Sequence, residues 1–155
     1  MDEQRRQVLK TGVGLGLLSA LLAAGLVSPR QAQAAVNKGA FEAKNLAEVY
    51  KALGIGAPPL SDKILIQGSD IAENGAVVPI GIKSNLPNTQ TVALLVEHNP
   101  TPLAAIYTLP ETTAADLVMR VKMGQTSNVV ALVKADGKFY SAQKEIKITA
   151  GGCGG

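Results

Sequence analysis

The sequence predicts a mainly β protein, an immunoglobulin-like antiparallel β-sandwich with one N-terminal helix and a flexible C-terminal arm. Between residues 63 and 149, short apolar runs recur at a spacing of about 8–12 residues and are separated by turn residues, as in sandwich folds. Two of these runs flank Asp136-Gly137, which is a strong hairpin signal. The chain ends in Gly151-Gly152-Cys153-Gly154-Gly155, where the glycines have no side chains to pack against a core. The runs and the hairpin predict the sandwich, and the glycines predict the arm.

One helix is predicted ahead of the strands, from Phe41 to Leu53. Four apolar residues in this stretch follow the i, i+3, i+4, i+7 spacing of a single helix face, and Gly54 is a candidate C-cap. A loop with glycine and two prolines follows over residues 56–59 and separates the helix from the strands. The four apolar positions are Leu46, Val49, Tyr50 and Leu53.

About seven short strands are predicted from residue 63 onward by the alternation of apolar and polar side chains. Turn residues at Glu73-Asn74-Gly75 and at Asn99-Pro100-Thr101-Pro102 separate some of them. Pro79 lies inside one run and predicts an edge position or a bulge, because proline has no backbone N–H to donate. The apolar runs span residues 64–66, 78–82, 92–96, 103–109, 117–123, 129–134, 139–141 and 146–148.

The first part of the chain has the features of an export signal. Gln4-Arg5-Arg6-Gln7-Val8-Leu9-Lys10 is a twin-arginine element, and a moderately apolar run follows over residues 11–27. The small residues of Ala32-Gln33-Ala34 predict cleavage after Ala34, so that the mature chain begins at Ala35. We therefore expect export to the periplasm by the twin-arginine route. The predicted parts are a signal peptide over 1–34, an immunoglobulin-like domain over 35–149 and an arm over 150–155.

Two alternatives for the leader stay open. Gln4 stands where Ser or Thr is usual in the twin-arginine motif, and Val8 stands where Phe is usual, so the general secretion route is one alternative. The other is an uncleaved membrane anchor, although the apolar run is rich in glycine and shorter than the roughly 20 residues of a membrane span. We expect no stable membrane association, because a cleavage signal rather than a charged anchor follows the run.

The composition does not indicate nucleic-acid binding. The chain has 15 basic and 12 acidic residues, a formal net charge of +3. Four of the basic and two of the acidic residues lie in the predicted leader, so 11 basic and 10 acidic residues remain, a net charge of +1. A nucleic-acid-binding domain needs a basic patch of its own. The remaining chain has the length of one domain with one core.

Cys153 is the only cysteine and the main candidate for chemistry. In an oxidising exported setting it cannot form an internal disulfide, so it is a free thiol, a modified thiol or half of an intermolecular bridge. The nearest basic residues, Lys144 and Lys147, belong to the preceding strand, so the sequence places no cation beside the thiol. Such a thiol suits passive attachment on an arm that reaches roughly 13 Å from Ala150, at about 3.3 Å per residue. A frayed terminus with an incidental cysteine is the alternative.

The other residues that could carry chemistry have simpler structural interpretations. His98 is the only histidine and lies beside a turn, which predicts a surface or capping residue rather than a ligand or base. Met119 and Met123 could suggest copper together with Cys153, but they lie on the apolar stripe of one strand and predict core packing. The sequence has no catalytic-triad order, phosphate loop or metal-ligand cluster, so we predict no enzyme, no cofactor and no bound metal. Three carboxylates fall in separate loops and predict solvated turns: Asp62, Asp70 and Glu73.

The terminal glycine-cysteine segment and the twin-arginine leader closely resemble SoxY, the carrier subunit of the periplasmic thiosulfate-oxidising system. Three internal stretches, residues 72–79, 99–104 and 122–130, resemble the body of that family. The resemblance implies an immunoglobulin-like sandwich in which Cys153 is the site of covalent substrate attachment. It also implies the residues of the swinging arm, which are Gly151, Gly152, Gly154 and Gly155.

The resemblance further implies a set of partners. The chain would form a heterodimer with a second small β-protein, SoxZ. Its cysteine would accept thiosulfate as a cysteine S-thiosulfonate through the haem protein SoxAX, and the manganese hydrolase SoxB would then release sulfate. In some organisms SoxCD would oxidise the remaining sulfane sulfur.

Two other classes of protein stay open at this point. Ubiquitin-like sulfur carriers also end in Gly-Gly, but they use the terminal carboxyl group and need ATP-dependent activation, which an exported protein does not meet. The second class is an exported structural module that dimerises through a Cys153 disulfide. A sulfur adduct on Cys153, a modified C-terminus or a plain disulfide dimer would distinguish the three classes.

Overall fold

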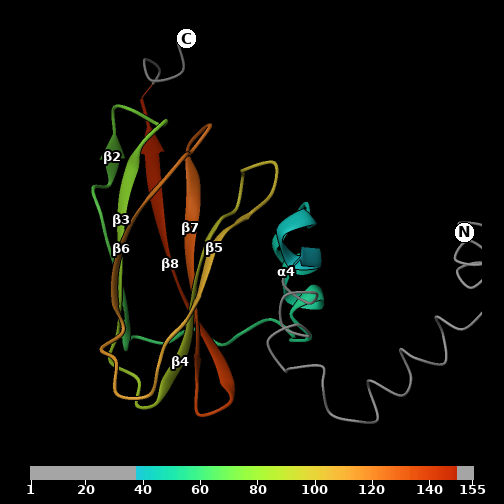
Figure 1. Ribbon diagram of the computed structural model, residues 1–155. Helices are drawn as coiled ribbons and strands as arrows, with labels where there is room; N and C mark the ends of the chain where they lie inside the picture. The colour runs from blue at the N-terminus through green and yellow to red at the C-terminus, as the bar shows by residue number, and fades with distance from the viewer. Residues whose placement is uncertain (1–37, 150–155) are drawn as a thin grey trace, which may run out of the picture. The chain divides into compact units, whose positions relative to one another are not determined.

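Residues 38–149 are the part of the protein that the computed structural model describes, and they lie within one compact unit (Figure 1). Two β-sheets stack on each other, one with the strand order β1-β3-β6 and one with the order β2-β8-β7-β4-β5. Neighbouring strands are antiparallel except for β2 and β8, which are parallel. This architecture confirms the predicted mainly β, immunoglobulin-like sandwich. The strands are β1 Ile64–Gln67, β2 Ile71–Ala72, β3 Val78–Ser84, β4 Thr89–Val96, β5 Leu103–Thr108, β6 Asp116–Val121, β7 Ser127–Ala135 and β8 Lys138–Ile148.

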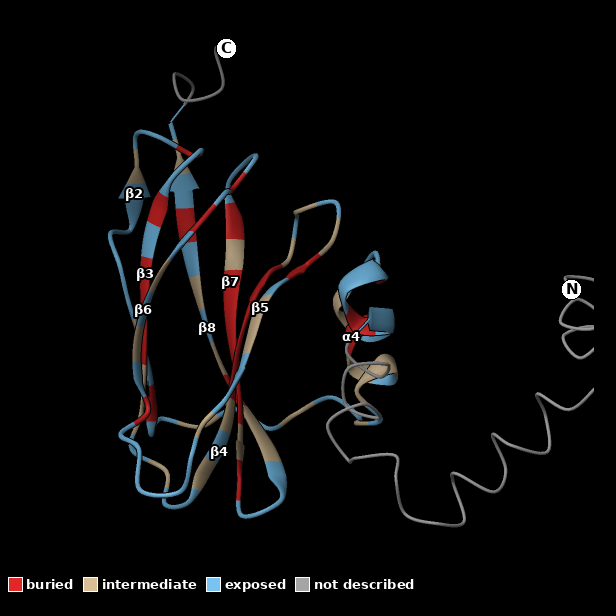
Figure 2. Ribbon diagram, in the orientation of Figure 1, coloured by how far each residue is buried: buried red, intermediate tan, exposed pale blue. Residues whose placement is uncertain are grey.

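The main core lies between the two sheets (Figure 2). In β3 the inward side chains are Val78, Ile80 and Ile82, each at most 1 % exposed. Successive side chains of a strand point to opposite faces, so a period of two in the sequence becomes a buried face and an outer face. The inward residues of the five-stranded sheet are Val92, Leu94, Val96, Val129, Ala131, Val133 and Ile146.

A second core covers the outer face of the five-stranded sheet. The helix α4, Leu46–Ala52, packs there together with the helical residues 38–42 that precede it. Val49 of α4 is fully buried in the same cluster as Leu95 of β4. As a result β4 is buried on both faces over residues 92–96, while the three-stranded sheet has no helix over its outer face among the described residues.

The predicted helix is not continuous. The continuous helix expected from Phe41 to Leu53 is interrupted, because Asn45 has an extended backbone (φ −150°) and acts as the N-cap of α4. The Asn45 side chain accepts a hydrogen bond from the backbone N–H of Glu48 at 2.9 Å, and its amide donates to the Glu48 carboxylate at the same distance. These bonds satisfy groups at the start of a helix, which is why asparagine starts a new helix here rather than continuing one.

The helix ends where the sequence predicts. Gly54 follows the C-cap residue Leu53 and has a φ of +71°. Its N–H donates to the carbonyl of Lys51 at 3.0 Å, and the N–H of Ile55 donates to that of Tyr50 at 2.9 Å. This pair of bonds is the Schellman arrangement, in which glycine takes the left-handed conformation without a steric cost. The prediction of Gly54 as the stop signal is confirmed.

The last two predicted runs, 139–141 and 146–148, form one continuous strand, β8. Its pairing with β7 continues without interruption from Ala135↔Lys138 to Ser127↔Ile146. The two strands are joined by Asp136 and Gly137 with φ angles of 48° and 75°, so the predicted two-residue hairpin is confirmed. The stretch between the two runs is mostly polar, so the sequence did not show that β8 is continuous. The pairing with β7 holds this stretch in the strand.

The edge position predicted from Pro79 is wrong for the strand as a whole, because β3 lies between β1 and β6. However, β1 pairs with β3 only from Gly81 to Ser84, whereas the β6 pairing extends to Val78. Pro79 is therefore paired on one side only, with Arg120. The proline occupies a locally open stretch of a central strand, where its missing N–H breaks no bond to β1.

Candidate functional site

The predicted attachment site and the glycines of the arm lie outside the described residues; they are Cys153, Gly151, Gly152, Gly154 and Gly155. The same is true of Arg5, Arg6, the run over 11–27 and the cleavage site predicted after Ala34. The structure does describe the end of β8, from which the arm continues, and the loops beside it. We call this region the arm base; it comprises Thr149 and the segments 73–77, 97–102 and 122–127.

The last described residues of the chain are held on two sides. On one side the backbone N–H of Thr149 donates to the carbonyl of Ala72 at 3.2 Å, which extends the parallel pairing of β2 with β8. On the other side the N–H of Ile148 donates to the side-chain hydroxyl of Thr126 at 3.0 Å. The backbone is therefore fixed by hydrogen bonds up to the residue that precedes the arm.

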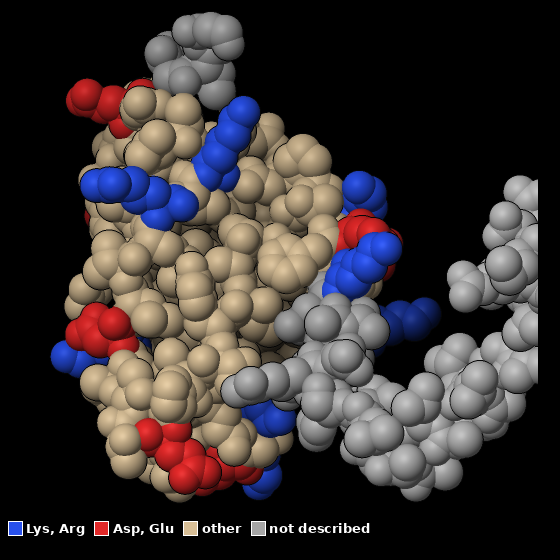
Figure 3. Space-filling model, in the orientation of Figure 1, with Lys and Arg blue, Asp and Glu red and all other residues tan. Residues whose placement is uncertain are grey.

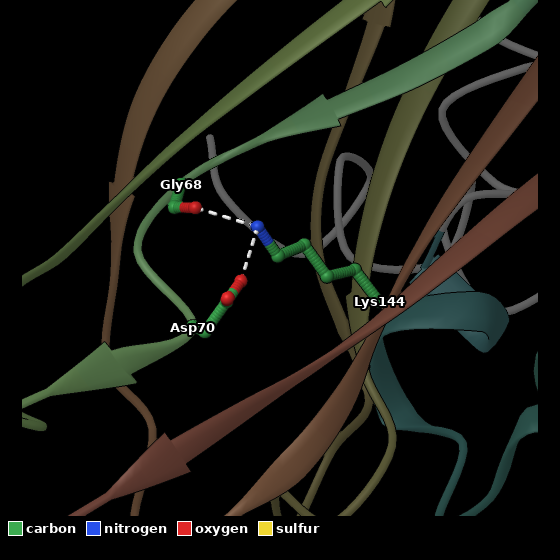
Figure 4. Close-up of polar contacts among 3 residues, drawn as sticks. All are labelled: Gly68, Asp70 and Lys144. Atoms are coloured by element: carbon green, nitrogen blue, oxygen red, sulfur yellow. Dashed lines mark hydrogen bonds and ion pairs between the residues drawn. The ribbon is translucent and has the colours of Figure 1, made fainter.

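Lys144 contacts the segment between β1 and β2 (Figure 4). Its Nζ lies 2.8 Å from Asp70 Oδ1 and donates to the carbonyl oxygen of Gly68 at 2.6 Å. The hydrogen bond from Lys144, together with its charge, holds the pKa of the Asp70 carboxyl below its ordinary value of 3.8. Both contacts tie β8 to the segment that passes from β1 in one sheet to β2 in the other.

Two turns of the arm base are in backbone contact at Gly75. The N–H of Met123 donates to the carbonyl of Gly75 at 2.7 Å. A Cβ placed on Gly75 would overlap the carbonyl oxygen of Met123 and lie 3.2 Å from the Cγ2 of Ile148. Glycine is required because backbone, which cannot move aside like a flexible side chain, occupies the space.

The loop after β4 is fastened to the loop before β7. The backbone N–H of His98 donates to the hydroxyl of Ser127 at 3.0 Å, and the imidazole Nδ1 lies 3.0 Å from the carbonyl oxygen of Thr126. Asn99 donates its side-chain amide to the carbonyl of Lys122 at 2.7 Å. His98 is thus an exposed loop residue that makes hydrogen bonds, as the sequence predicted.

The structural interpretations of the other candidates are also confirmed. Met123 is fully buried in the main core and Met119 packs against the same cluster. The three carboxylates at positions 62, 70 and 73 are exposed. Within residues 38–149 no group of three or more His, Cys, Asp or Glu side chains could hold a metal ion, and no helix is long and apolar enough to cross a membrane.

A hollow of about 740 Å³ lies at the other end of the sandwich, lined in part by Ser84, Thr112 and Asp136. Asp136 precedes the start of β8, whereas the arm follows its end. A strand of 11 residues spans about 35 Å at roughly 3.3 Å per residue, and the arm reaches only roughly 13 Å. The hollow is therefore beyond the reach of the Cys153 thiol of the same molecule.

Sequence reasoning missed several residues of the arm base. It identified the turn at Gly75 but not the close approach of Met123, and it assigned no role to Thr126 or Ser127. Several hydrogen bonds of these residues join positions that are far apart in the sequence, such as Thr126 with Ile148, 22 residues apart, and Gly75 with Met123, 48 residues apart. No local pattern carries such information, although the Asn-Gly dipeptide marks one of the positions.

Comparisons with known proteins agree with this geometry. A model of the family "Sulfur oxidation protein SoxY" matches residues 50–153. The solved structure of the sulfur carrier protein SoxY from Chlorobium limicola f thiosulfatophilum is 32 % identical, with a TM-score of 0.57, over 64 % of this chain and 92 % of that one. No curated protein matches the sequence.

A superoxide reductase (neelaredoxin) from Ignicoccus hospitalis is similar in fold alone. It is 15 % identical, with a TM-score of 0.50, and the match covers 56 % of this chain and 80 % of that chain. The family match, by contrast, spans the strands of the sandwich and runs through Cys153. On this basis the chain belongs to the family of the sulfur oxidation protein SoxY.

Proposed function

We propose that this protein is a non-catalytic carrier that holds sulfur intermediates covalently on Cys153 during thiosulfate oxidation. The observation that carries the proposal is the SoxY family match, which extends to Cys153. The similar solved structure from Chlorobium belongs to a sulfur carrier protein. The arm base adds a physical reason, because a chain fixed at Thr149 and continued by glycines can offer a thiol at a defined end of the domain.

The carrier chemistry needs partner enzymes at each step. In the first, the Cys153 Sγ forms a bond to the outer sulfur of thiosulfate, the thiol proton is released and two electrons pass, one at a time, through the haem protein SoxAX to its electron acceptor. In the second, SoxB adds water across the bond between the outer sulfur and the sulfonate, which releases sulfate and leaves a persulfide. SoxCD oxidises that sulfane sulfur in hosts that have it. The carrier supplies the sulfur atom and the reach, and the partners supply the catalytic groups.

We further propose that the chain works as a heterodimer with SoxZ in the periplasm, after export by the twin-arginine route. Arg5 and Arg6 support that route. A small protein without a cofactor has reason to fold before export if it carries a partner that lacks a leader. Replacing both arginines by lysine should leave the precursor and SoxZ in the cytoplasm. If SoxZ still reaches the periplasm in normal amount, co-export is wrong.

Mass spectrometry of the protein isolated from cells oxidising thiosulfate tests the carrier function. We expect a sulfur-containing adduct on the C-terminal peptide at Cys153, removed by a thiol reductant. A plain disulfide dimer would support the structural module instead, and a modified terminal carboxyl would support the ubiquitin-like class. As the matched functional test, Cys153→Ser should keep the fold but abolish thiosulfate oxidation in a reconstituted system, because an alcohol cannot replace the thiol as sulfur acceptor.

A further inference from the structure

We propose that the partner strand in the heterodimer adds to β5, on the open side of the sandwich formed by the edge strands β5 and β6. We call this the β5–β6 side. The inference rests on the proposed function for the existence of a β-protein partner, and it goes beyond it by naming the surface and the mode of binding. The occupant is an extended, uncharged strand of that partner.

β5 is the unprotected edge of the larger sheet. Its six residues, Leu103–Thr108, pair with β4 on one side and with no strand on the other among the described residues. Natural proteins protect exposed edges with charges, proline or very short strands. The opposite edge, β2, has two residues, and β6 carries Asp116 and Arg120. β5 has no charged residue and no proline, so its free backbone N–H and C=O groups can accept another strand.

The opposite side of the sandwich is already closed. There the chain passes from β1 to β2, and Lys144 bridges β8 to Gly68 and Asp70. The segment before β1 adds a parallel bridge between Leu60 and Ser141 of β8. On the β5–β6 side the two edge strands belong to different sheets, and no hydrogen bond joins residues 103–108 to residues 116–121.

The surface of the β5–β6 side is apolar and uncharged at its centre. Tyr107 of β5 is 44 % exposed and Val118 of β6 is 77 % exposed. In Figure 3, which shows this side, Lys, Arg, Asp and Glu side chains lie around the margin and leave a central area without charge. Interfaces have this composition, with aromatic residues in the middle and charged residues at the rim.

Binding at β5 would leave the arm accessible. In the sheet order, β7 and β4 lie between β8 and β5, so three strand spacings separate the edge from the strand that leads to Cys153. At about 4.8 Å per spacing this is about 14 Å. A partner strand on β5 therefore need not cover the arm base, which the sulfur-oxidising enzymes must approach.

The test compares two matched lysine substitutions in the full mature chain. Tyr107→Lys places a charge on β5, and Leu65→Lys places one on β1, the edge strand on the closed side; both side chains belong to residues that are 44 % exposed. Affinity for SoxZ of the same organism is measured by isothermal titration calorimetry, with circular dichroism to confirm folding. We expect Tyr107→Lys to weaken binding about 30-fold or more, and Leu65→Lys to change it less than about threefold.

Hydrogen exchange gives a second readout that does not depend on a variant. SoxZ should slow exchange of backbone amides within residues 103–108 and leave residues 64–67 unchanged. If wild-type chain binds SoxZ but neither result appears, the β5 site is wrong while the heterodimer stands. If SoxZ does not bind the wild-type chain, the proposed heterodimer itself is wrong, and this site with it. Protection of β5 that rises with the concentration of this chain alone would assign the edge to a second copy and overturn the proposal.

Discussion

Met123 donates its backbone N–H to the carbonyl of Gly75 over 2.7 Å, and this bond joins two turns that flank the end of β8. The contact brings together residues from the turn before β3 and the segment after β6. A Cβ at Gly75 would overlap the Met123 carbonyl oxygen and press on Ile148, two residues before the arm. The position of the arm base thus depends on the absence of one side chain.

Gly75→Ala should destabilise the domain by about 1–3 kcal/mol, because the added methyl group meets backbone and forces the two turns apart. Urea unfolding at neutral pH measures the change. Gly124→Ala is the matched control in the same region, since a Cβ there has no atom within 4 Å. Equal effects of the two substitutions would contradict the steric explanation.

The Asp70–Lys144 pair predicts a pH-dependent contribution to stability. Lys144 lowers the folded-state pKa of Asp70 below 3.8, so the carboxylate stabilises the fold above that pH. This contribution is lost as the pH falls through the lowered pKa. Asp70→Asn should therefore reduce the unfolding free energy at pH 7, and the difference from wild type should shrink on acidification to about pH 2.

The control for this prediction is the same substitution in a Lys144→Met background. Without the Lys144 ammonium group, Asp70→Asn should lose most of its pH-dependent effect, as read from urea unfolding across the same pH range, because only the smaller influence of Lys147 still lowers the pKa of Asp70. A pH dependence that survives undiminished in the Lys144→Met background would assign it to another group.

Ser127→Ala should cost about 1 kcal/mol of unfolding free energy, the usual contribution of an intramolecular hydrogen bond. Ser127 is 2 % exposed; its hydroxyl accepts from the N–H of His98 and donates to the carbonyl of Asn128. Ser69→Ala, at an exposed position between β1 and β2, is the control and should change stability by less than about 0.5 kcal/mol. Hydrogen exchange of the His98 amide should also accelerate in Ser127→Ala alone.

Gly151→Val together with Gly152→Val should keep the Cys153 thiol but restrict and thicken the arm, because branching at Cβ limits the backbone. The variant should react with a small alkylating reagent at the wild-type rate and turn over poorly with SoxAX and SoxB. Full turnover with both enzymes would disprove the swinging arm, even if Cys153 is essential.

Local sequence pattern was sufficient to predict most of the strands and the two turns that require a positive φ. The hairpin at Asp136-Gly137 and the helix stop at Gly54 were predictable because each conformation requires residues that tolerate a positive φ. The helix break at Asn45 was missed, although all four apolar positions that predicted the helix, from Leu46 to Leu53, follow it. Pro79 was misplaced because proline excludes a hydrogen bond on one side of a strand, not a central position in the sheet.

The sequence by itself determined the strand periodicity, the family resemblance and the candidate thiol, all of which depend on residue types and short spacings. The tertiary structure alone decided how the arm base is built. Thr126 is joined to Ile148, and Met123 to Gly75, by hydrogen bonds. These pairs are distant along the chain, and they meet only because the order of the strands in two sheets brings their turns to one end. Sequence spacing records the chemistry of each residue, whereas proximity comes from how the sheets stack.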